Sequence, residues 1–263
     1  MAIGEMTFFS RELQRSTHFR FILPDGPFPF DRENPCYARE AKVLILLHGH
    51  GNSNDEWITN SSIRELASRY NIAVFMPNGE NSFYLNREAA KTNYMNYVGR
   101  ELPEFVCKSF GFSSRRENMM IGGLSMGGFG ALHTGLAFPD AFGKIMALSS
   151  ALIIHMVAGL QPGDEDRFGG YDYYTSIFGP LEHILESDVN PEQLALKAKK
   201  SGAPVPEIFM ACGTEDFLLE NNRQFHRFLE NSGIPHQYYE DTGDHNFQFW
   251  NPWLLKGIQW MAS

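Results

Sequence analysis

The sequence lacks any cluster of basic residues and carries a formal net charge of −9 at pH 7. Because nucleic-acid binding requires clustered lysine and arginine side chains, this charge argues against a nucleic-acid partner. No apolar run approaches the ~18 residues that a membrane-spanning helix needs, so we expect no membrane partner. The N-terminal segment has no basic start followed by a long apolar stretch, as a secretory signal would have, and we therefore expect a cytoplasmic protein.

Cysteine is also scarce. The chain has three cysteines, Cys36, Cys107 and Cys212, which lie far apart and form no C-x-x-C pair. This pattern predicts neither a disulfide framework nor a zinc site. Repeats and low-complexity tracts are missing as well, and 263 residues is an ordinary length for one α/β domain. We therefore expect a single domain over residues 1–263, while the sequence leaves open whether it forms a homo-oligomer.

Apolar runs alternate with helical patterns along most of the chain. Strands are predicted at 7–13 and 18–24 (an antiparallel pair), 42–49, 72–78, 118–125, 144–150, 207–213 and 236–241. Helices are predicted at 63–70, 93–110, 126–137, 219–231 and 247–261. Strands that alternate with helices indicate a mostly parallel central sheet that is covered by helices on both faces. We therefore predict an α/β fold.

One long segment, residues 151–206, does not follow this alternation. It has no clear strand, and it contains the stretch PGDEDRFGGYDYY and a helical pattern, PEQLALKAKK. Pro191 stands near the start of that helix, which is a position that suits proline. We interpret the segment as a short cap-like insertion that lies over the carboxyl edge of the sheet, above the active site.

The stretch IGGLSMGGFGAL (121–132) places Ser125 between Gly123 and Gly127 in a G-x-S-x-G pattern. A predicted strand precedes the serine and a predicted helix follows it, which is the context in which this pattern exposes a nucleophile on a sharp turn. The glycines leave room for the tight backbone around a strained serine. The alternative is a closely packed strand–helix junction with an incidental serine, so the pattern needs support from elsewhere in the chain.

A serine nucleophile needs a histidine base and an acid that orients the base. In proteins with this strand–serine–helix turn, the order along the chain is serine, acid, histidine. Of the nine histidines, His245 follows the last predicted strand in a short loop. The strand at 207–213 leads directly into Glu215 and Asp216, and we choose Asp216 because it lies deeper in the loop. Ser125, Asp216 and His245 are therefore the predicted catalytic residues.

Two backbone N–H groups are candidates for an oxyanion hole. Met126 follows the nucleophile at a helix N-terminus, where free N–H groups point outward. His50 lies in the segment LLHGHGNSNDEW between two glycines, which let a substrate approach the backbone closely. His48 and His50 also raise the alternative of a metal site, but no third ligand follows at a suitable spacing, so we predict no metal.

Together these segments resemble the esterase D-type family of α/β-hydrolases, and within it the small bacterial tributyrin and acetyl esterases. The matching segments are LLHGHGNSNDEW, FMPNGENSFYLN, ELPEFV, GGLSMGGFGAL, CGTEDFLLENN and GDHNFQFW, with YYTSIFG and LALKAKK in the insertion. The resemblance covers nearly the whole chain. It implies an α/β-hydrolase fold, the same catalytic and oxyanion residues, and no cofactor.

The resemblance further implies a serine carboxylesterase that hydrolyses short-chain acyl esters, such as acetyl and butyryl esters and acetylated or feruloylated sugars. An acyltransferase or an S-formylglutathione-type thioesterase would use the same residues. However, S-formylglutathione hydrolases usually carry a cysteine in the first oxyanion loop, where this chain reads GHGNSN. The expected partner is thus a small-molecule ester, and Trp57 and Tyr84 are candidates to line its pocket.

Overall fold

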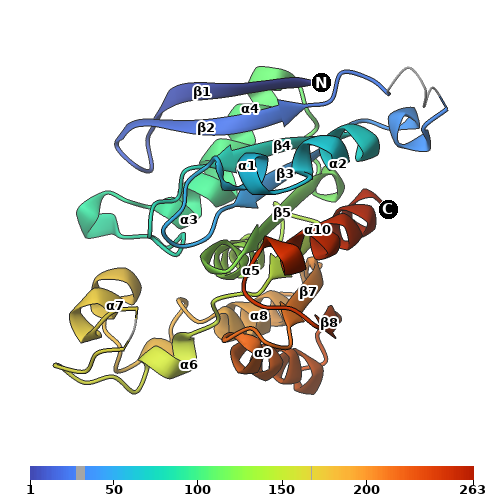
Figure 1. The fold of residues 1–263 in the computed structure, drawn as a ribbon. Coiled ribbons are helices and arrows are strands. Elements are labelled where there is room, and N and C mark those ends of the chain that lie inside the picture. The colour runs from blue at the N-terminus through green and yellow to red at the C-terminus, as the bar shows by residue number, and fades with distance from the viewer. Residues whose placement is uncertain (28–32, 167) are drawn as a thin grey trace.

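A central sheet of eight strands runs through the part of the chain that the computed structural model describes, residues 1–27, 33–166 and 168–263 (Figure 1). Its order is β1-β2-β4-β3-β5-β6-β7-β8. The strands are β1 (Ala2–Ser10), β2 (Arg15–Leu23), β3 (Lys42–Leu47), β4 (Ile72–Pro77), β5 (Met119–Leu124), β6 (Lys144–Leu148), β7 (Glu207–Gly213) and β8 (Gln237–Asp241). β1 and β2 pair antiparallel, as do β2 and β4, and the remaining pairs are parallel. The predicted, mostly parallel sheet is confirmed.

The central strands are buried on both faces of the sheet. Every residue of β3, β4 and β5 is buried. Strands in this position have nearly uninterrupted apolar sequences, because helices cover both sides of a parallel sheet. β1 lies at the edge instead, and its positions alternate between exposed and partly covered along most of the strand.

Helices cover both faces of the sheet, and part of the insertion adds helices outside these two layers. The helices are α1 (Glu56–Asn60), α2 (Ile63–Tyr70), α3 (Tyr94–Asn96), α4 (Leu102–Phe110), α5 (Met126–Ala137), α6 (Ile154–Val157), α7 (Tyr171–Phe178), α8 (Pro191–Lys200), α9 (Leu219–Asn231) and α10 (Phe247–Ala262), with short helical turns at Pro35–Ala38, Glu88–Ala90, Arg116–Asn118 and Ile184–Glu186. α4, α5, α8 and α9 share one core cluster, to which Phe129 and Leu194 belong. α1, α2 and α10 share the other, to which Leu66 and Leu254 belong. No helix within the described ranges is long and apolar enough to cross a membrane.

The single helix predicted over 93–110 is interrupted. α3 and α4 are separated by a π-helical turn, Tyr97–Glu101. The physical reason is Pro103, which has no N–H to donate to the carbonyl of Gly99 in a regular α-helix. The apolar pattern thus located the helical segment but not the break within it.

The insertion divides into two parts. The described residues of 151–206 add no strand to the sheet. Figure 1 shows α6 and α7 standing apart from the sheet, whereas α8 packs against α5. The first part of the segment therefore projects from the sheet, and the second part helps to cover one face of it.

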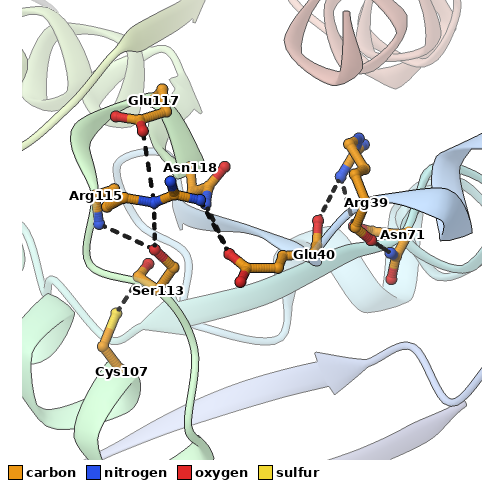
Figure 2. A network of polar contacts seen from close by, with 8 residues as sticks. All are labelled: Arg39, Glu40, Asn71, Cys107, Ser113, Arg115, Glu117 and Asn118. Atoms are coloured by element: carbon orange, nitrogen blue, oxygen red, sulfur yellow. Dashed lines mark hydrogen bonds and ion pairs between the residues drawn. The ribbon is translucent and has the colours of Figure 1, made fainter.

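Side chains tie together the loops that lead into β3, β4 and β5 (Figure 2). Glu40 precedes β3 and accepts hydrogen bonds from Arg115 at 3.2 Å and Asn118 at 3.4 Å, which lie before or at the start of β5. Asn71 precedes β4 and donates to the Arg39 carbonyl at 3.2 Å. These contacts link the amino ends of the three strands, and the site described next lies at their carboxyl ends.

Candidate active site

Ser125 stands at the sharp turn between β5 and α5. Its backbone has φ 53° and ψ −120°, a conformation that residues with a side chain rarely adopt. The Ser125 N–H donates to the Leu148 carbonyl at 2.9 Å, and the Ser125 carbonyl accepts from the N–H groups of Phe129 at 3.0 Å and Ala151 at 2.9 Å. These bonds hold the strained turn in place at the carboxyl edge of the sheet.

The two flanking glycines are needed for steric reasons. A Cβ atom at Gly123 would lie 2.3 Å from the carbonyl oxygen of Gly127. A Cβ atom at Gly127 would lie 2.4 Å from the carbonyl oxygen of Leu47. Because the obstructing atoms belong to the backbone of packed elements, they cannot move aside cheaply. Any side chain at either position would therefore disturb the turn that carries Ser125.

The structure brings the three predicted catalytic side chains together. His245 Nε2 lies 3.0 Å from Ser125 Oγ, and His245 Nδ1 lies 2.9 Å from Asp216 Oδ2. The three residues follow the carboxyl ends of β5, β7 and β8, which lie on one edge of the sheet. In such an arrangement the acid orients the imidazole, and the imidazole is placed to accept the serine proton.

The Asp216 side chain is fully buried. Burial by itself opposes ionisation, but hydrogen bonds from His245, Ser149 and the Leu218 N–H outweigh it and hold the pKa of Asp216 below its usual value. The carboxylate is therefore ionised at neutral pH. It is available to stabilise a positive charge on the imidazole of His245.

The neighbouring acid, Glu215, faces a different part of the loop. Its carboxylate accepts hydrogen bonds from the Gly243 N–H and from the Thr214 hydroxyl. Glu215 is exposed, whereas Asp216 is buried. Of the two acids that the sequence offered, only Asp216 meets His245 in the described structure.

Two unpaired backbone donors lie beside the serine. His50 and Met126 line the same pocket as Ser125. Neither of their N–H groups has a hydrogen-bond partner among the described residues. By contrast, the N–H groups of Gly49 and Gly51, on either side of His50, donate to side-chain oxygens at 2.6 and 2.8 Å. Free N–H groups next to a nucleophile are the feature that an oxyanion hole requires.

His48 orients the peptide that carries the His50 N–H. The Gly79 N–H donates to His48 Nε2 at 2.8 Å, so Nδ1 bears the proton and donates to the Gly49 carbonyl at 2.8 Å. The His50 N–H belongs to the same trans peptide and points away from that carbonyl. Burial lowers the pKa of His48, which favours the neutral ring. Within the described ranges, no group of three or more His, Cys, Asp or Glu side chains is placed to hold a metal ion.

A pocket of about 490 Å³ opens over Ser125 and His245. Its lining consists of His50, Phe83, Ser125, Met126, Ala151, Ile153, Met156, Val157, Leu160, Asp166, Phe168, Tyr173, Tyr174, Phe217, Leu218 and His245. Most of these side chains are apolar, and His50 Nε2 contacts the Tyr173 hydroxyl of the insertion at 2.6 Å. The pocket is therefore suited to a small and largely apolar group.

The structure corrects two predicted substrate contacts. Trp57 is fully buried in the core, where its Nε1–H donates to the Leu47 carbonyl at 3.0 Å. Tyr84 is fully buried as well, and its hydroxyl accepts from the His48 N–H at 3.0 Å. Neither side chain lines the pocket. Trp57 belongs to the core cluster on one face of the sheet and Tyr84 to the cluster on the other, and both hydrogen-bond to the backbone at the end of β3.

Two further residues of the site were not predicted from the sequence. Phe217 lines the pocket, and its ring centroid lies 4.7 Å from that of His245. Glu56 is only 5% exposed and accepts a hydrogen bond from the Gly49 N–H. The position of Phe217 next to Asp216 was a usable signal. The polar sequence NSNDEW around Glu56 predicts an exposed loop, so nothing local indicated that this carboxylate is buried.

These features recur in known proteins. Residues 10–261 match the family model Esterase, described as "Putative esterase". The chain belongs to this family. It is 41% identical to the acetyl esterase of Caldicellulosiruptor saccharolyticus, over 100% of this chain and 99% of that protein. It is 31% identical to the S-formylglutathione hydrolase of Paracoccus denitrificans, over 90% of this chain and 88% of that protein.

Solved structures agree with this assignment. The substrate-bound fluorophosphonate-binding serine hydrolase F of Staphylococcus aureus superposes with a TM-score of 0.85 at 27% identity, over 100% of this chain and 98% of that one. A ferulic acid esterase superposes with a TM-score of 0.74 at 22% identity, over 99% and 98% of the two chains, which bears on the fold alone. The chain therefore has the α/β-hydrolase fold and is a carboxylic ester hydrolase of the esterase D type that acts on small-molecule esters.

Proposed function

We propose that the chain is a serine carboxylesterase that hydrolyses short-chain acyl esters, chiefly acetyl and butyryl esters, including acetylated or feruloylated sugars. The observation that carries this proposal is the continuous hydrogen-bonded series from Asp216 through His245 to Ser125 beneath the pocket. The 41% identical relative is named an acetyl esterase, which supports a short acyl group. The modest, apolar pocket supports the same choice.

The proposed reaction is acyl transfer through Ser125. His245 Nε2 takes the hydroxyl proton as Ser125 Oγ attacks the ester carbonyl carbon, and the N–H groups of His50 and Met126 bind the oxyanion. The C–O bond to the alcohol then breaks, and the alcohol leaves with the proton from His245. A water molecule, deprotonated by His245, hydrolyses the acyl-serine and regenerates the hydroxyl. Asp216 stabilises the imidazolium and stays ionised throughout.

We also propose that residues 1–263 act as one hydrolase domain in which the insertion, 151–206, shapes the acyl and alcohol subsites. More than half of the described lining residues come from the first part of that insertion. Its aromatic residues Tyr173 and Tyr174 stand in the pocket wall, where they are placed to contact a sugar or an aromatic acid.

The central test is Ser125→Ala, with p-nitrophenyl acetate and p-nitrophenyl butyrate as substrates. We expect kcat to fall by roughly 10⁴-fold or more, because the variant retains binding and oxyanion donors but has no nucleophile. Ser176→Ala, which alters an exposed serine on α7, is the matched control and should keep full activity. Wild-type turnover by Ser125→Ala, or its labelling by a fluorophosphonate, would overturn the proposal.

A second candidate is thioester hydrolysis, specifically of S-formylglutathione. It is supported by the Paracoccus denitrificans relative and by a Staphylococcus aureus S-formylglutathione hydrolase, which is 27% identical with a TM-score of 0.83. The same acyl-serine chemistry serves both substrates. Measuring kcat/KM for S-formylglutathione and for p-nitrophenyl acetate on one preparation separates them, and the ester proposal fails if the thioester is strongly preferred.

A further inference from the structure

Glu56, the first residue of α1, is a buried carboxylate behind the oxyanion loop, which we define as residues 48–52. Glu56 is only 5% exposed. Oε2 accepts a hydrogen bond from the Gly49 N–H at 2.6 Å, and Oε1 accepts one from Asn52 Nδ2 at 2.7 Å. Burial raises the pKa of Glu56, and the hydrogen bond from the Gly49 N–H, the nearby His245 and the hydrogen bond from Asn52 oppose this rise. A buried carboxylate that is held mainly by two amide donors is costly for stability, which suggests a role in function.

The carboxylate lies next to the nucleophile. A Cβ atom built on Gly49 would be 3.5 Å from Glu56 Oε2 and 3.6 Å from Ser125 Cβ. The carboxylate oxygen and the serine Cβ therefore both lie within 4 Å of one point beside Gly49. Any shift of Gly49 away from Glu56 would change the distance between the oxyanion loop and Ser125.

The hydrogen bonds of the loop fix the direction of the His50 N–H. Glu56 holds the Gly49 N–H, the His48 ring holds the Gly49 carbonyl, and the Gly51 N–H donates to a side-chain oxygen at 2.8 Å. The His50 N–H lies between these anchored groups and has no partner of its own among the described residues. Two glycines give this loop unusual backbone freedom, so its orientation depends on such anchors.

We propose that Glu56 is a positioning residue of the esterase, whose carboxylate holds the oxyanion loop so that the His50 N–H meets the developing oxyanion. It touches no substrate and acts through Gly49. The inference rests on the proposed function, because it assumes that the His50 N–H stabilises an acyl-transfer transition state. Its tests are therefore made on an enzyme first shown to lose activity with Ser125→Ala.

The first test compares Glu56→Gln with Glu56→Asp. Glutamine removes the charge and so weakens the hydrogen bond to the Gly49 N–H, and its amide N–H₂ is matched only if the Asn52 amide turns over to present Oδ1. Aspartate keeps the charge but is one methylene too short to reach Gly49. We expect kcat to fall at least about tenfold in both variants, toward the 10²–10³-fold cost of a lost oxyanion donor. kcat and kcat/KM should fall together while KM stays near its wild-type value, since the contact matters in the transition state.

The second test is the exchange pair Asn52→Asp with Glu56→Gln. Here Gln Oε1 accepts from the Gly49 N–H, as Glu56 does in the wild type, and Gln Nε2 donates to the new aspartate. Both hydrogen bonds are thus restored, and only the one between positions 52 and 56 is reversed in direction. We expect the pair to recover most of the kcat that Glu56→Gln alone loses. Thermal unfolding of the same variants reports their stability, whereas kcat reports the position of the loop. A merely structural role would lower the stability and kcat together, whereas a positioning role lowers kcat in variants that remain folded.

The outcomes separate the two proposals. Glu65→Gln on α2, an exposed glutamate that pairs with Arg69, is the matched control and should leave kcat unchanged. If the wild type shows no Ser125-dependent hydrolysis, the proposed function fails. If it does, and Glu56→Gln and Glu56→Asp both keep wild-type kcat, the inference about Glu56 is wrong. Should Glu56→Gln not fold, full activity of Glu56→Asp, or no kcat above that of Glu56→Asp in the exchange pair, overturns the inference.

Discussion

At the scale of single residues, burial decides the protonation state of a histidine that the reaction does not use. His133 lies about two turns after Ser125 on α5 and is 3% exposed. Its Nε2–H donates to the Asp188 carbonyl at 2.8 Å, and its ring stacks on Phe129 with centroids 5.6 Å apart. Burial lowers the pKa of His133 from 6.5 to about 4. The folded protein therefore holds this ring neutral at pH values where an unfolded chain would protonate it.

This shift makes His133 a source of acid sensitivity. Between pH 6.5 and 4 the unfolded state binds more protons than the folded state, so the free energy of unfolding falls as the pH decreases. From pH 7 to pH 5 we expect His133 to contribute a loss of about 2 kcal/mol. Urea unfolding at both pH values should show a smaller loss for His133→Gln, which keeps an N–H donor for the Asp188 carbonyl. An equal loss in the variant would contradict the assignment.

At the scale of elements, the turn between β5 and α5 depends on two packed backbones that approach each other closely. A Cβ at Gly127 would be 2.4 Å from the Leu47 carbonyl oxygen and 2.7 Å from that of His48. α5 therefore reaches the end of β3 at a point where only a hydrogen atom fits. The same contact places the start of α5, with the free Met126 N–H, beside the oxyanion loop.

Substituting Gly127 by alanine tests this contact. We expect Gly127→Ala to lower the free energy of unfolding by about 1–3 kcal/mol, as overpacking does elsewhere, and to lower kcat by moving Ser125. Gly159→Ala is the matched control, because nothing lies within 4 Å of a Cβ at that position. Its effect on stability should stay within about 0.5 kcal/mol. Thermal unfolding measures the effect on stability, and ester hydrolysis measures the effect on kcat. Similar stability and similar kcat in the two variants would refute the steric account.

At the scale of the whole molecule, the pocket joins segments that are far apart in sequence. Ser125 and His245 are separated by 120 positions and meet because β5 and β8 end on the same edge of the sheet. The insertion adds the opposite wall, and its Tyr173 hydroxyl contacts His50 Nε2 at 2.6 Å. This bond links α7 to the oxyanion loop across the mouth of the pocket.

Tyr173→Phe removes that link and leaves the aromatic ring in place. One neutral hydrogen bond contributes about 0.5–1.5 kcal/mol, so we expect KM for a short-chain ester to rise roughly two- to tenfold, with kcat little changed. Tyr171→Phe, on the same helix but outside the pocket, is the control. Steady-state kinetics on both variants decides the point, and an unchanged KM in Tyr173→Phe would show that the bond does not shape the pocket.

The fold was largely predictable because its signals are local. A continuous apolar run at 42–49 indicates a strand that is buried on both faces, and β3 is such a strand. The glycines around Ser125 likewise indicate a tight turn at their own positions. The helix over 93–110 was predicted without its π-helical break, although Pro103 was a local signal for it. Trp57 and Tyr84 were assigned to the pocket because the direction of a side chain depends on distant residues. Aromatic residues near a site have one sequence signature whether they face substrate or core.

The sequence by itself determined the order of strands and helices, the elbow at Ser125 and the short list of acids and bases that follow later strands. These features depend on periodicity and on steric limits that act over a few residues. The sequence already favoured Asp216 over Glu215, but only the tertiary structure brought Asp216 to His245, buried Glu56 beneath Gly49 and set Tyr173 against His50. Each of these contacts joins segments brought together by the sheet and its insertion, and no local pattern encodes the direction in which a side chain then points.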